Sequence, residues 1–165
     1  MAKKDKTMPL EECHSFLSRA QVGRLALFDD EYPYNVPLNF AFVDGKIYVH
    51  GAFEGKKMEL IARNPKLCFE VDEGEPISPE KMGDCSYSYR SVMVFGEARP
   101  LAPEEKELFM KAALGLFQKY TSSHVPEITE KMIHKTQMVE ISVHHITGKK
   151  STDLCKPPVT EVIGV

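Results

Sequence analysis

The sequence contains no apolar run of the roughly 18–20 residues that a membrane-spanning helix needs. It also lacks a basic surplus, because 21 Lys and Arg residues stand against 24 Asp and Glu residues and give a net charge of −3. Nucleic-acid-binding proteins usually carry a strong positive excess, so we expect neither a membrane nor a nucleic-acid partner. The N-terminal stretch M-A-K-K-D-K-T-M-P-L has basic residues but no apolar segment after them. It does not read as a secretory signal, and we expect a cytoplasmic location.

Cysteine motifs are also missing, since none of the four cysteines belongs to a C-x-x-C pair, the signature of zinc and thioredoxin-like sites. Free thiols are typical of a reducing compartment. His144 and His145 are neighbours on an expected strand and would point to opposite faces, so they cannot easily bind one metal ion. We therefore expect no metal site. The cysteines are Cys13, Cys68, Cys85 and Cys155.

The sequence does contain six short stretches of strand-forming residues, with helical segments between them. A length of 165 residues fits one domain, which we expect to span residues 1–150 and to be followed by a loose tail, 151–165. Residues 73–84 are rich in Gly, Pro and charge and predict a loop. The expected strands are residues 22–28, 34–43, 46–50, 66–71, 87–98 and 137–146, and the expected helices are residues 9–20, 56–63, 103–120 and 126–135.

The connections between these strands favour an antiparallel sheet. Asp44-Gly45 is a strong hairpin signal. Pro37 cannot donate a hydrogen bond to a ladder, so we expect a bulge or a sheet edge there. Six short strands favour closure into a barrel, and the order of elements is not the strand–helix alternation of a Rossmann fold. We therefore predict a mainly β fold, a six-stranded antiparallel barrel with peripheral α-helices.

One segment, Tyr48–Lys57 (Y-V-H-G-A-F-E-G-K-K), has the pattern of a phosphate site. A strand ends at His50, a glycine-containing loop exposes backbone N–H groups, and Lys56 and Lys57 open a helix. Unpaired N–H groups and the helix dipole attract anions to a helix N-terminus, and the two lysines add positive charge there. The spacing alone also fits two solvated surface lysines, which are common on helices.

Five segments, in the same order along the chain, resemble the FMN-binding split barrels. More narrowly, they are similar to the pyridoxamine-phosphate-oxidase-like branch that contains the nitroimidazole reductases. The segments cover nearly the whole chain, and the ordered set is more specific than any one of them. They are V-G-R-L-A-L (Val22–Leu27), Y-N-V-P-L-N-F (Tyr34–Phe40), I-Y-V-H-G-A-F-E-G-K-K-M-E-L-I-A-R-N-P-K-L-C-F-E-V (Ile47–Val71), Y-R-S-V-M-V-F-G-E-A (Tyr89–Ala98) and H-H-I-T-G-K-K (His144–Lys150).

The resemblance implies a six-stranded antiparallel split β-barrel and a set of FMN contacts. The basic pair Lys56 and Lys57 would hold the phosphate, and His50 and Gly51 would face the cofactor. The backbone of the second strand would line the flavin ring. That lining maps to Val36, Pro37, Leu38 and Asn39.

The resemblance also implies a homodimer with the cofactor between the two subunits. Arg90 and Ser91 occupy the position of an Arg-Gln pair of the oxidases, in which the glutamine touches the flavin. Serine is shorter than glutamine, so the contact by Ser91 stays open. The C-terminal R-L-H-D-R pattern of the true oxidases is missing, and H-H-I-T-G-K-K stands in its place.

The function that follows from the resemblance is an oxidoreductase that takes electrons from a reduced nicotinamide and reduces a small, flat acceptor such as a nitro-aromatic. A bound flavin would carry the electron chemistry. His50 would be catalytic, or would only shape the pocket. Two alternatives remain open: a non-enzymatic flavin carrier or redox sensor, and a haem- or deazaflavin-binding member of the same barrel family.

Overall fold

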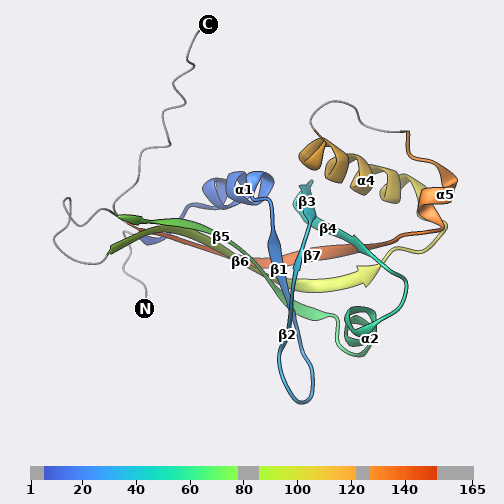
Figure 1. Cartoon of the computed structure of the whole chain (residues 1–165), viewed down its shortest axis with the longest axis horizontal. Helices are drawn as coiled ribbons and strands as arrows, with labels where there is room; N and C mark the ends of the chain where they lie inside the picture. The colour runs from blue at the N-terminus through green and yellow to red at the C-terminus, as the bar shows by residue number, and fades with distance from the viewer. Residues whose placement is uncertain (1–5, 78–85, 122–126, 152–165) are drawn as a thin grey trace, which may run out of the picture.

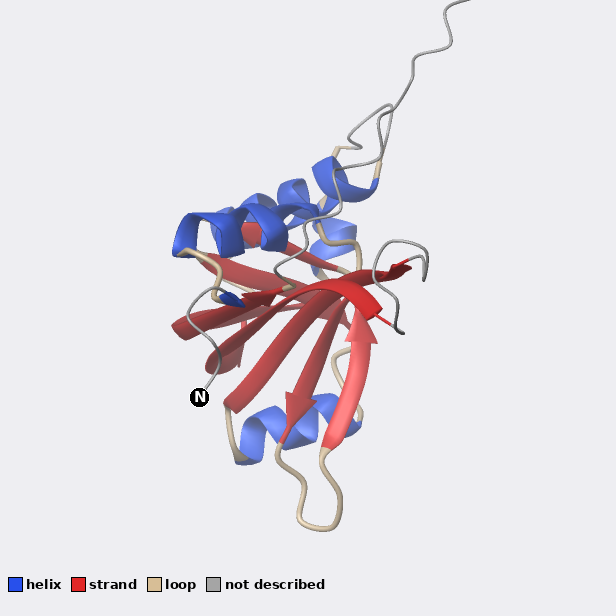
Figure 2. Cartoon of the chain, turned by 90° about the vertical axis from the view of Figure 1, so that its left-hand side faces the viewer, coloured by secondary structure: helices blue, strands red, loops and turns tan. Residues whose placement is uncertain are grey.

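The computed structural model of the chain describes residues 6–77, 86–121 and 127–151, which form one antiparallel sheet of seven strands and four helices. The strands are β1 (Gly23–Leu27), β2 (Tyr34–Leu38), β3 (Phe40–Val43), β4 (Lys46–Gly51), β5 (Lys66–Ile77), β6 (Ser86–Pro100) and β7 (Gln137–Lys150). The helices are α1 (Leu10–Arg19), α2 (Lys56–Arg63), α4 (Lys106–Tyr120) and α5 (Glu130–Ile133). Figure 1 shows α1 and α4 on one side of the sheet and α2 on the other, and Figure 2 shows the same division from the side.

The sheet is curled into a barrel by the link between β2 and β3. The strand order is β2-β1-β5-β6-β7-β4-β3, so β2 and β3 stand at the two ends of the sheet. Only Asn39 separates them along the chain. Seven flat strands about 4.8 Å apart would hold their outer members roughly 29 Å apart, which one residue cannot span. The two ends must therefore meet, which confirms the mainly β, antiparallel split barrel. The strand expected over residues 34–43 is two strands, so the sheet has seven.

Pro37 lies on an edge without a bulge. The β1–β2 register runs without a shift, from Gly23 opposite Leu38 to Leu27 opposite Tyr34. The expectation of an edge is confirmed and that of a bulge is wrong. β2 pairs on one side only in the described sheet, and proline is tolerated on such edge strands.

Strands β5 and β7 are several residues longer than the sequence predicts. β5 continues to Ile77, through the first part of the expected loop 73–84, because its register with β6 runs unbroken from Lys66–Glu97 to Ile77–Ser86. β7 continues to Lys150 along the same β6 neighbour.

Two helices are shorter than the sequence predicts. The helix expected over residues 103–120 begins at Lys106, and the helix expected over residues 126–135 is only Glu130–Ile133. Residues 78–85, Pro126 and most of the expected tail lie outside the described residues, whereas Ser151 is buried.

The core has two parts. The barrel interior is filled by alternate residues of the strands and is closed by α1 through Phe16 and Leu17 and by α2 through Leu60 and Ile61. A second cluster lies between the outer face of β3–β4 and helix α4. It contains Ala41, Tyr48, Leu101, Phe109, Ala112, Ala113, Leu116 and Met138.

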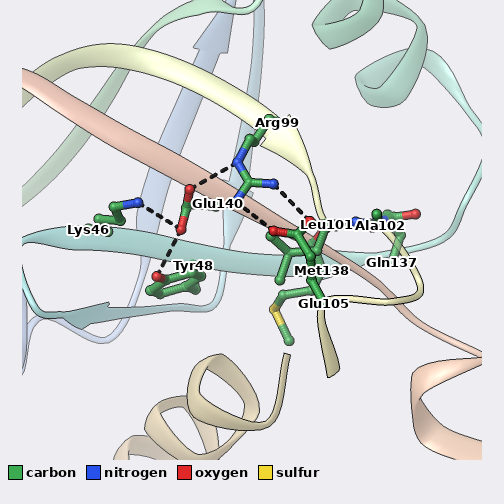
Figure 3. Close-up of polar contacts among 9 residues, drawn as sticks. All are labelled: Lys46, Tyr48, Arg99, Leu101, Ala102, Glu105, Gln137, Met138 and Glu140. Carbon is green, nitrogen blue, oxygen red and sulfur yellow. Dashed lines mark hydrogen bonds and ion pairs between the residues drawn. The ribbon is translucent and has the colours of Figure 1, made fainter. Parts of the chain in front are cut away.

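A buried carboxylate joins β4, β6 and β7 beside this second cluster. Glu140 is 1% exposed, and its oxygens accept hydrogen bonds from Tyr48 Oη and Arg99 Nε and pair with Lys46 Nζ, each at 3.0 Å. Arg99 also forms a two-pronged ion pair with Glu105 (Figure 3). Burial raises the pKa of Glu140, but the bonds from Lys46 and Tyr48 and the charge of Arg99 outweigh it and leave the pKa lowered.

Candidate functional site

The end of β4 and the start of α2 form a tight, glycine-rich turn. Gly55 has a φ of +116°, which a side chain would strain, and its carbonyl accepts hydrogen bonds from Met58 N at 2.8 Å and Glu59 N at 3.1 Å. α2 therefore begins at Lys56, as the sequence predicts. Its first N–H groups and its dipole point towards the loop that follows β4.

Lys57 is a half-buried cation that lies against the end of β4. A Cβ built on Gly51 would come within 2.7 Å of Lys57 Nζ, so the ammonium occupies the space that a larger residue at position 51 would take. Burial lowers the pKa of Lys57. Within residues 6–77, 86–121 and 127–151, no carboxylate pairs with it. An anion beside Lys57 would offset the cost of burying its charge.

Lys56 has a different environment from that of its neighbour. Its Nζ pairs with Asp29 at 2.8 Å, and Arg63 approaches the same carboxylate at 3.7 Å and Asp30 at 2.9 Å. The Lys56 hydrogen bond is the main reason that the pKa of Asp29 is lowered, and the same bond raises the pKa of Lys56. The two lysines expected to act as a pair are thus divided between an ion-pair cluster and a half-buried position.

Asp29 and Arg63 belong to this region although the sequence alone does not predict it. The acidic run Asp29-Asp30-Glu31 predicts a turn, and nothing local says which cation it meets. One signal was available, because Lys56 and Arg63 are seven residues apart and therefore share a face of an α-helix. Two cations on one helix face can meet a single acidic turn.

His50 stands at the end of β4, level with Asn39. It lies on the same face of the strand as Tyr48 and opposite Met138 of β7. The β3–β4 register pairs Phe40 with Val49, so Asn39 is at the next position, beside His50. The imidazole is exposed, yet desolvation by the surrounding protein and the charge of Lys57 lower its pKa below the usual 6.5. The uncharged imidazole is therefore the main form at neutral pH.

The second-strand residues alternate in their exposure. Val36 and Leu38 are half-buried and pack against the barrel core, whereas Pro37 and Asn39 are exposed. Because β2 is an edge, its backbone has one side without a ladder partner in the described sheet. The structure thus brings the end of β2, Asn39, His50, Gly51 and Lys57 to one end of the barrel.

Arg90 and Ser91 are not part of this group within one chain. Arg90 lies opposite Lys150 on β7, whereas His50 lies opposite Met138. Twelve positions of β7 separate Met138 from Lys150, a path of roughly 40 Å at about 3.3 Å per residue. The Arg90 guanidinium instead approaches Glu73 at 3.4 Å.

The described residues contain neither a cluster of possible metal ligands nor a membrane-spanning helix. Across residues 6–77, 86–121 and 127–151, no three His, Cys, Asp or Glu side chains are grouped so that they could hold a metal ion. None of the helices in the same ranges is both long and apolar enough to cross a bilayer. His144 and His145 are both exposed, since β7 shifts its register between Phe95 and Gly96 of β6 at this point.

The curled antiparallel sheet, with β2 and β3 at its two ends, places the protein in the split-barrel class, and one end of this barrel carries a half-buried lysine, a glycine and a histidine. The chain belongs to the pyridoxamine 5'-phosphate oxidase family, a flavin-binding split-barrel family whose sequence pattern matches residues 9–150. Among curated proteins, it is 29% identical over 68 residues to the uncharacterised protein RA0666 of Rhizobium meliloti. That match spans 41% of this chain and 44% of the relative, less than half of each.

Several solved structures share the fold. A candidate 5-nitroimidazole antibiotic resistance protein from Bacteroides thetaiotaomicron is 23% identical with a TM-score of 0.73, over 87% of this chain and 86% of that one. A FAD-binding protein from Mesorhizobium loti is 26% identical with a TM-score of 0.66, over 88% and 97%. A FAD- and haem-binding protein from Mycobacterium smegmatis is 18% identical with a TM-score of 0.72, over 93% and 77%. These likenesses agree with the fold expected from the sequence.

Proposed function

We propose that this protein is an FMN-binding flavoprotein that passes electrons from a reduced nicotinamide to a small, flat acceptor of the nitroimidazole or nitro-aromatic type. The observation that carries the proposal is the Lys57 ammonium, half-buried against Gly51 at the start of α2. The flavin phosphate is an anion, and a half-buried cation at a helix N-terminus suits it. Lys56 would add a second positive charge at the phosphate if it left its ion pair with Asp29 and bound the phosphate instead.

The flavin ring would lie along the edge strand β2, beside His50. Exposed edge backbone from Val36 to Asn39 offers donors and acceptors to the polar rim of the ring. His50, uncharged at neutral pH, would offer a ring N–H as a hydrogen-bond donor rather than act as a resident acid. This assignment makes His50 the catalytic candidate of the chain.

A bound flavin supplies the hydride exchange with the nicotinamide and the electrons for the acceptor. One hydride and one proton provide the two electrons that turn a nitro group into a nitroso group with release of water. The part of this chain would be to bind and orient the flavin and to exclude bulky acceptors. A flavin carrier or redox sensor would need the same flavin-binding residues but would not reduce an acceptor.

A homodimer is the second part of the proposal. Arg90 and Ser91 lie roughly 40 Å along β7 from the His50 end, so one chain does not complete the expected set of flavin contacts. A second copy could contribute its own pair. The outer face of β6 supports such a contact, because Met93 and Phe95 are 40% and 39% exposed and a groove of about 470 Å³ lies beside Phe95.

The absorption spectrum of the purified protein tests the cofactor. We expect flavin bands and release of FMN on heating, identified by mass. Release of FAD would keep the flavoprotein and change the nucleotide, in line with the names of the Mesorhizobium loti and Mycobacterium smegmatis proteins. A Soret band without flavin would contradict the proposal.

Turnover and assembly need separate measurements. Oxidation of a reduced nicotinamide with 2-methyl-5-nitroimidazole as acceptor would support an enzyme, and no turnover across a panel of acceptors would favour the carrier.

Light scattering tests the assembly and should give the mass of a dimer. Met93→Asp with Phe95→Asp should give monomers that bind flavin poorly, and a monomeric wild-type protein that holds flavin tightly would contradict the shared site.

A further inference from the structure

A small cavity lies on the side of the sheet that α4 covers, near the end of β4. Its volume is about 250 Å³. The walls come from segments far apart in the sequence: the loop after β4, the segment after β6, helices α4 and α5, and the start of β7. The residues that matter for the argument are Phe53, Leu101, Phe109, His134, Gln137 and Met138.

The strand register brings this cavity next to His50. Met138 and Gln137 both line it, and they lie opposite His50 and Gly51 respectively. His50 also shares a face of β4 with Tyr48, which packs in the same cluster as the wall residue Phe109. The imidazole on β4 and the cavity walls on the neighbouring strand β7 therefore lie on the same face of the sheet.

The lining suits an uncharged ring. Among the described residues, no Asp, Glu, Lys or Arg lines the cavity. Phe53 is 47% exposed at the wall and offers an aromatic surface. Gln137 Nε2 donates to Leu101 O at 3.0 Å and to Met138 O at 2.9 Å, so the amide is held in place, and His134 adds a second polar group. Apolar walls with a few fixed polar groups are typical of small-molecule sites.

The size restricts the ligand further. Pockets for drug-sized ligands usually enclose about 300–1,000 Å³, so this cavity is smaller than that range. A single ring with small substituents fits that limit. A whole nicotinamide or adenine dinucleotide does not.

We propose that this cavity is the binding subsite for the electron acceptor, and that it selects neutral, single-ring heteroaromatic compounds. The inference rests on the proposed function, because it assigns the acceptor of the same flavin site. Phe53 covers one side of the ring, and His134 and Gln137 offer polar contacts to its substituents. The acceptor then lies beside His50 without competing for Lys57.

Two variants with opposite effects on the cavity test the subsite, with 2-methyl-5-nitroimidazole as the probe. Phe53→Ala removes an aromatic wall, and Ala102→Leu fills the space from an exposed wall position. Met110→Ala is the matched control, because Met110 is also a large apolar residue that is 47% exposed, and it lies outside the lining. Probe affinity is measured by calorimetry on the full chain, flavin affinity by fluorescence quenching, and folding by the melting temperature.

We expect both cavity variants to weaken probe binding at least tenfold and to raise KM with little change in kcat, while flavin affinity and melting temperature stay as in the wild type. Met110→Ala should match the wild type throughout. Equal probe affinity in all four proteins, or no probe binding to the wild type, would overturn the subsite. Failure of the wild-type protein to bind any flavin would instead contradict the proposed function, so the two failures are distinguishable.

Discussion

The Lys57 ammonium packs against the backbone of Gly51, 2.7 Å from where a Cβ at that position would lie. Apart from the chain neighbours of Gly51, no other described residue has an atom within 4 Å of that position, and Gly51 has no positive φ. The glycine is therefore needed for space and not for its backbone conformation. This contact joins the end of β4 to the start of α2 and sets the position of the ammonium on which the proposed phosphate site mainly depends.

Gly51→Ala should weaken FMN binding without weakening the fold. The added methyl group meets only the flexible end of Lys57, so we expect the free energy of unfolding to stay within about 0.5 kcal/mol of the wild type. The displaced ammonium should lower FMN affinity but leave riboflavin affinity nearly unchanged, because riboflavin lacks the phosphate. Fluorescence titrations with both flavins measure the difference. An equal loss of affinity for FMN and for riboflavin would argue against a phosphate contact.

The two lysines should contribute unequally to FMN binding. Lys57→Ala removes the half-buried cation and should cost more affinity than Lys56→Ala, whose charge is already paired with Asp29. Asp29→Asn should release Lys56 and raise FMN affinity several-fold. The three variants are compared by the same titration, at low and high salt because exposed ion pairs are screened. Weaker FMN binding in Asp29→Asn would show that the carboxylate orders the site and does not compete with the phosphate.

The pKa of His50 should depend on the charge of Lys57. Burial and the Lys57 charge lower the pKa of His50 below 6.5, so the imidazole signals should shift at a midpoint below that value in NMR spectra. Lys57→Ala should move the midpoint upward. The linkage sign is that the unfolded chain binds the proton more readily, so this histidine reduces stability as the pH falls below 6.5. An unchanged midpoint in Lys57→Ala would contradict the electrostatic contact.

Glu140→Gln should destabilise the protein and remove part of its acid sensitivity. The carboxylate accepts charged and neutral hydrogen bonds in a buried position, so we expect a loss of about 1.5–3 kcal/mol. Because its pKa is lowered in the folded protein, its contribution is complete above the ordinary value of 4.5 and is lost as the pH falls through the folded value. Denaturant unfolding between pH 7 and pH 3 measures both effects. Glu130→Gln, in an exposed pair with Lys106, is the control and should change little.

Tyr120→Phe should loosen the corner where β2 passes into β3. The Tyr120 hydroxyl accepts from Phe40 N at 2.9 Å and lies 2.7 Å from Gln21 O, to which it can donate. Loss of these bonds leaves part-buried backbone groups unpaired, and we expect a cost of about 1–3 kcal/mol. Thermal unfolding measures it. Tyr32→Phe, at a residue that is 72% exposed, should stay within about 0.5 kcal/mol.

Several elements of the fold could be predicted from residues that are close together in the chain. Helix α2 begins at Lys56 and ends at Arg63, as expected, because Gly55 permits the turn and Asn64-Pro65 ends the helical pattern. The hairpin at Asp44-Gly45 is also confirmed, with both residues at positive φ. Strand lengths were harder to predict. β5 and β7 extend through charged and glycine-containing stretches because β6 offers a continuous row of backbone partners.

The order of the residues was enough to predict the family, the antiparallel barrel and the segment from His50 to Lys57 that ends a strand and opens a helix. Turns, helix ends and strand patterns depend on near neighbours in the chain, so they can be recognised without the structure. The tertiary structure alone decided that Lys56 is paired while Lys57 packs against Gly51. The Asp29 that makes the difference comes from another strand connection. It also decided that Arg90 and Ser91 lie far along the sheet from His50, since that separation follows from the register of β7 with two different strands. Contacts between distant segments cannot be read from local patterns, and here those contacts distinguish the two lysines.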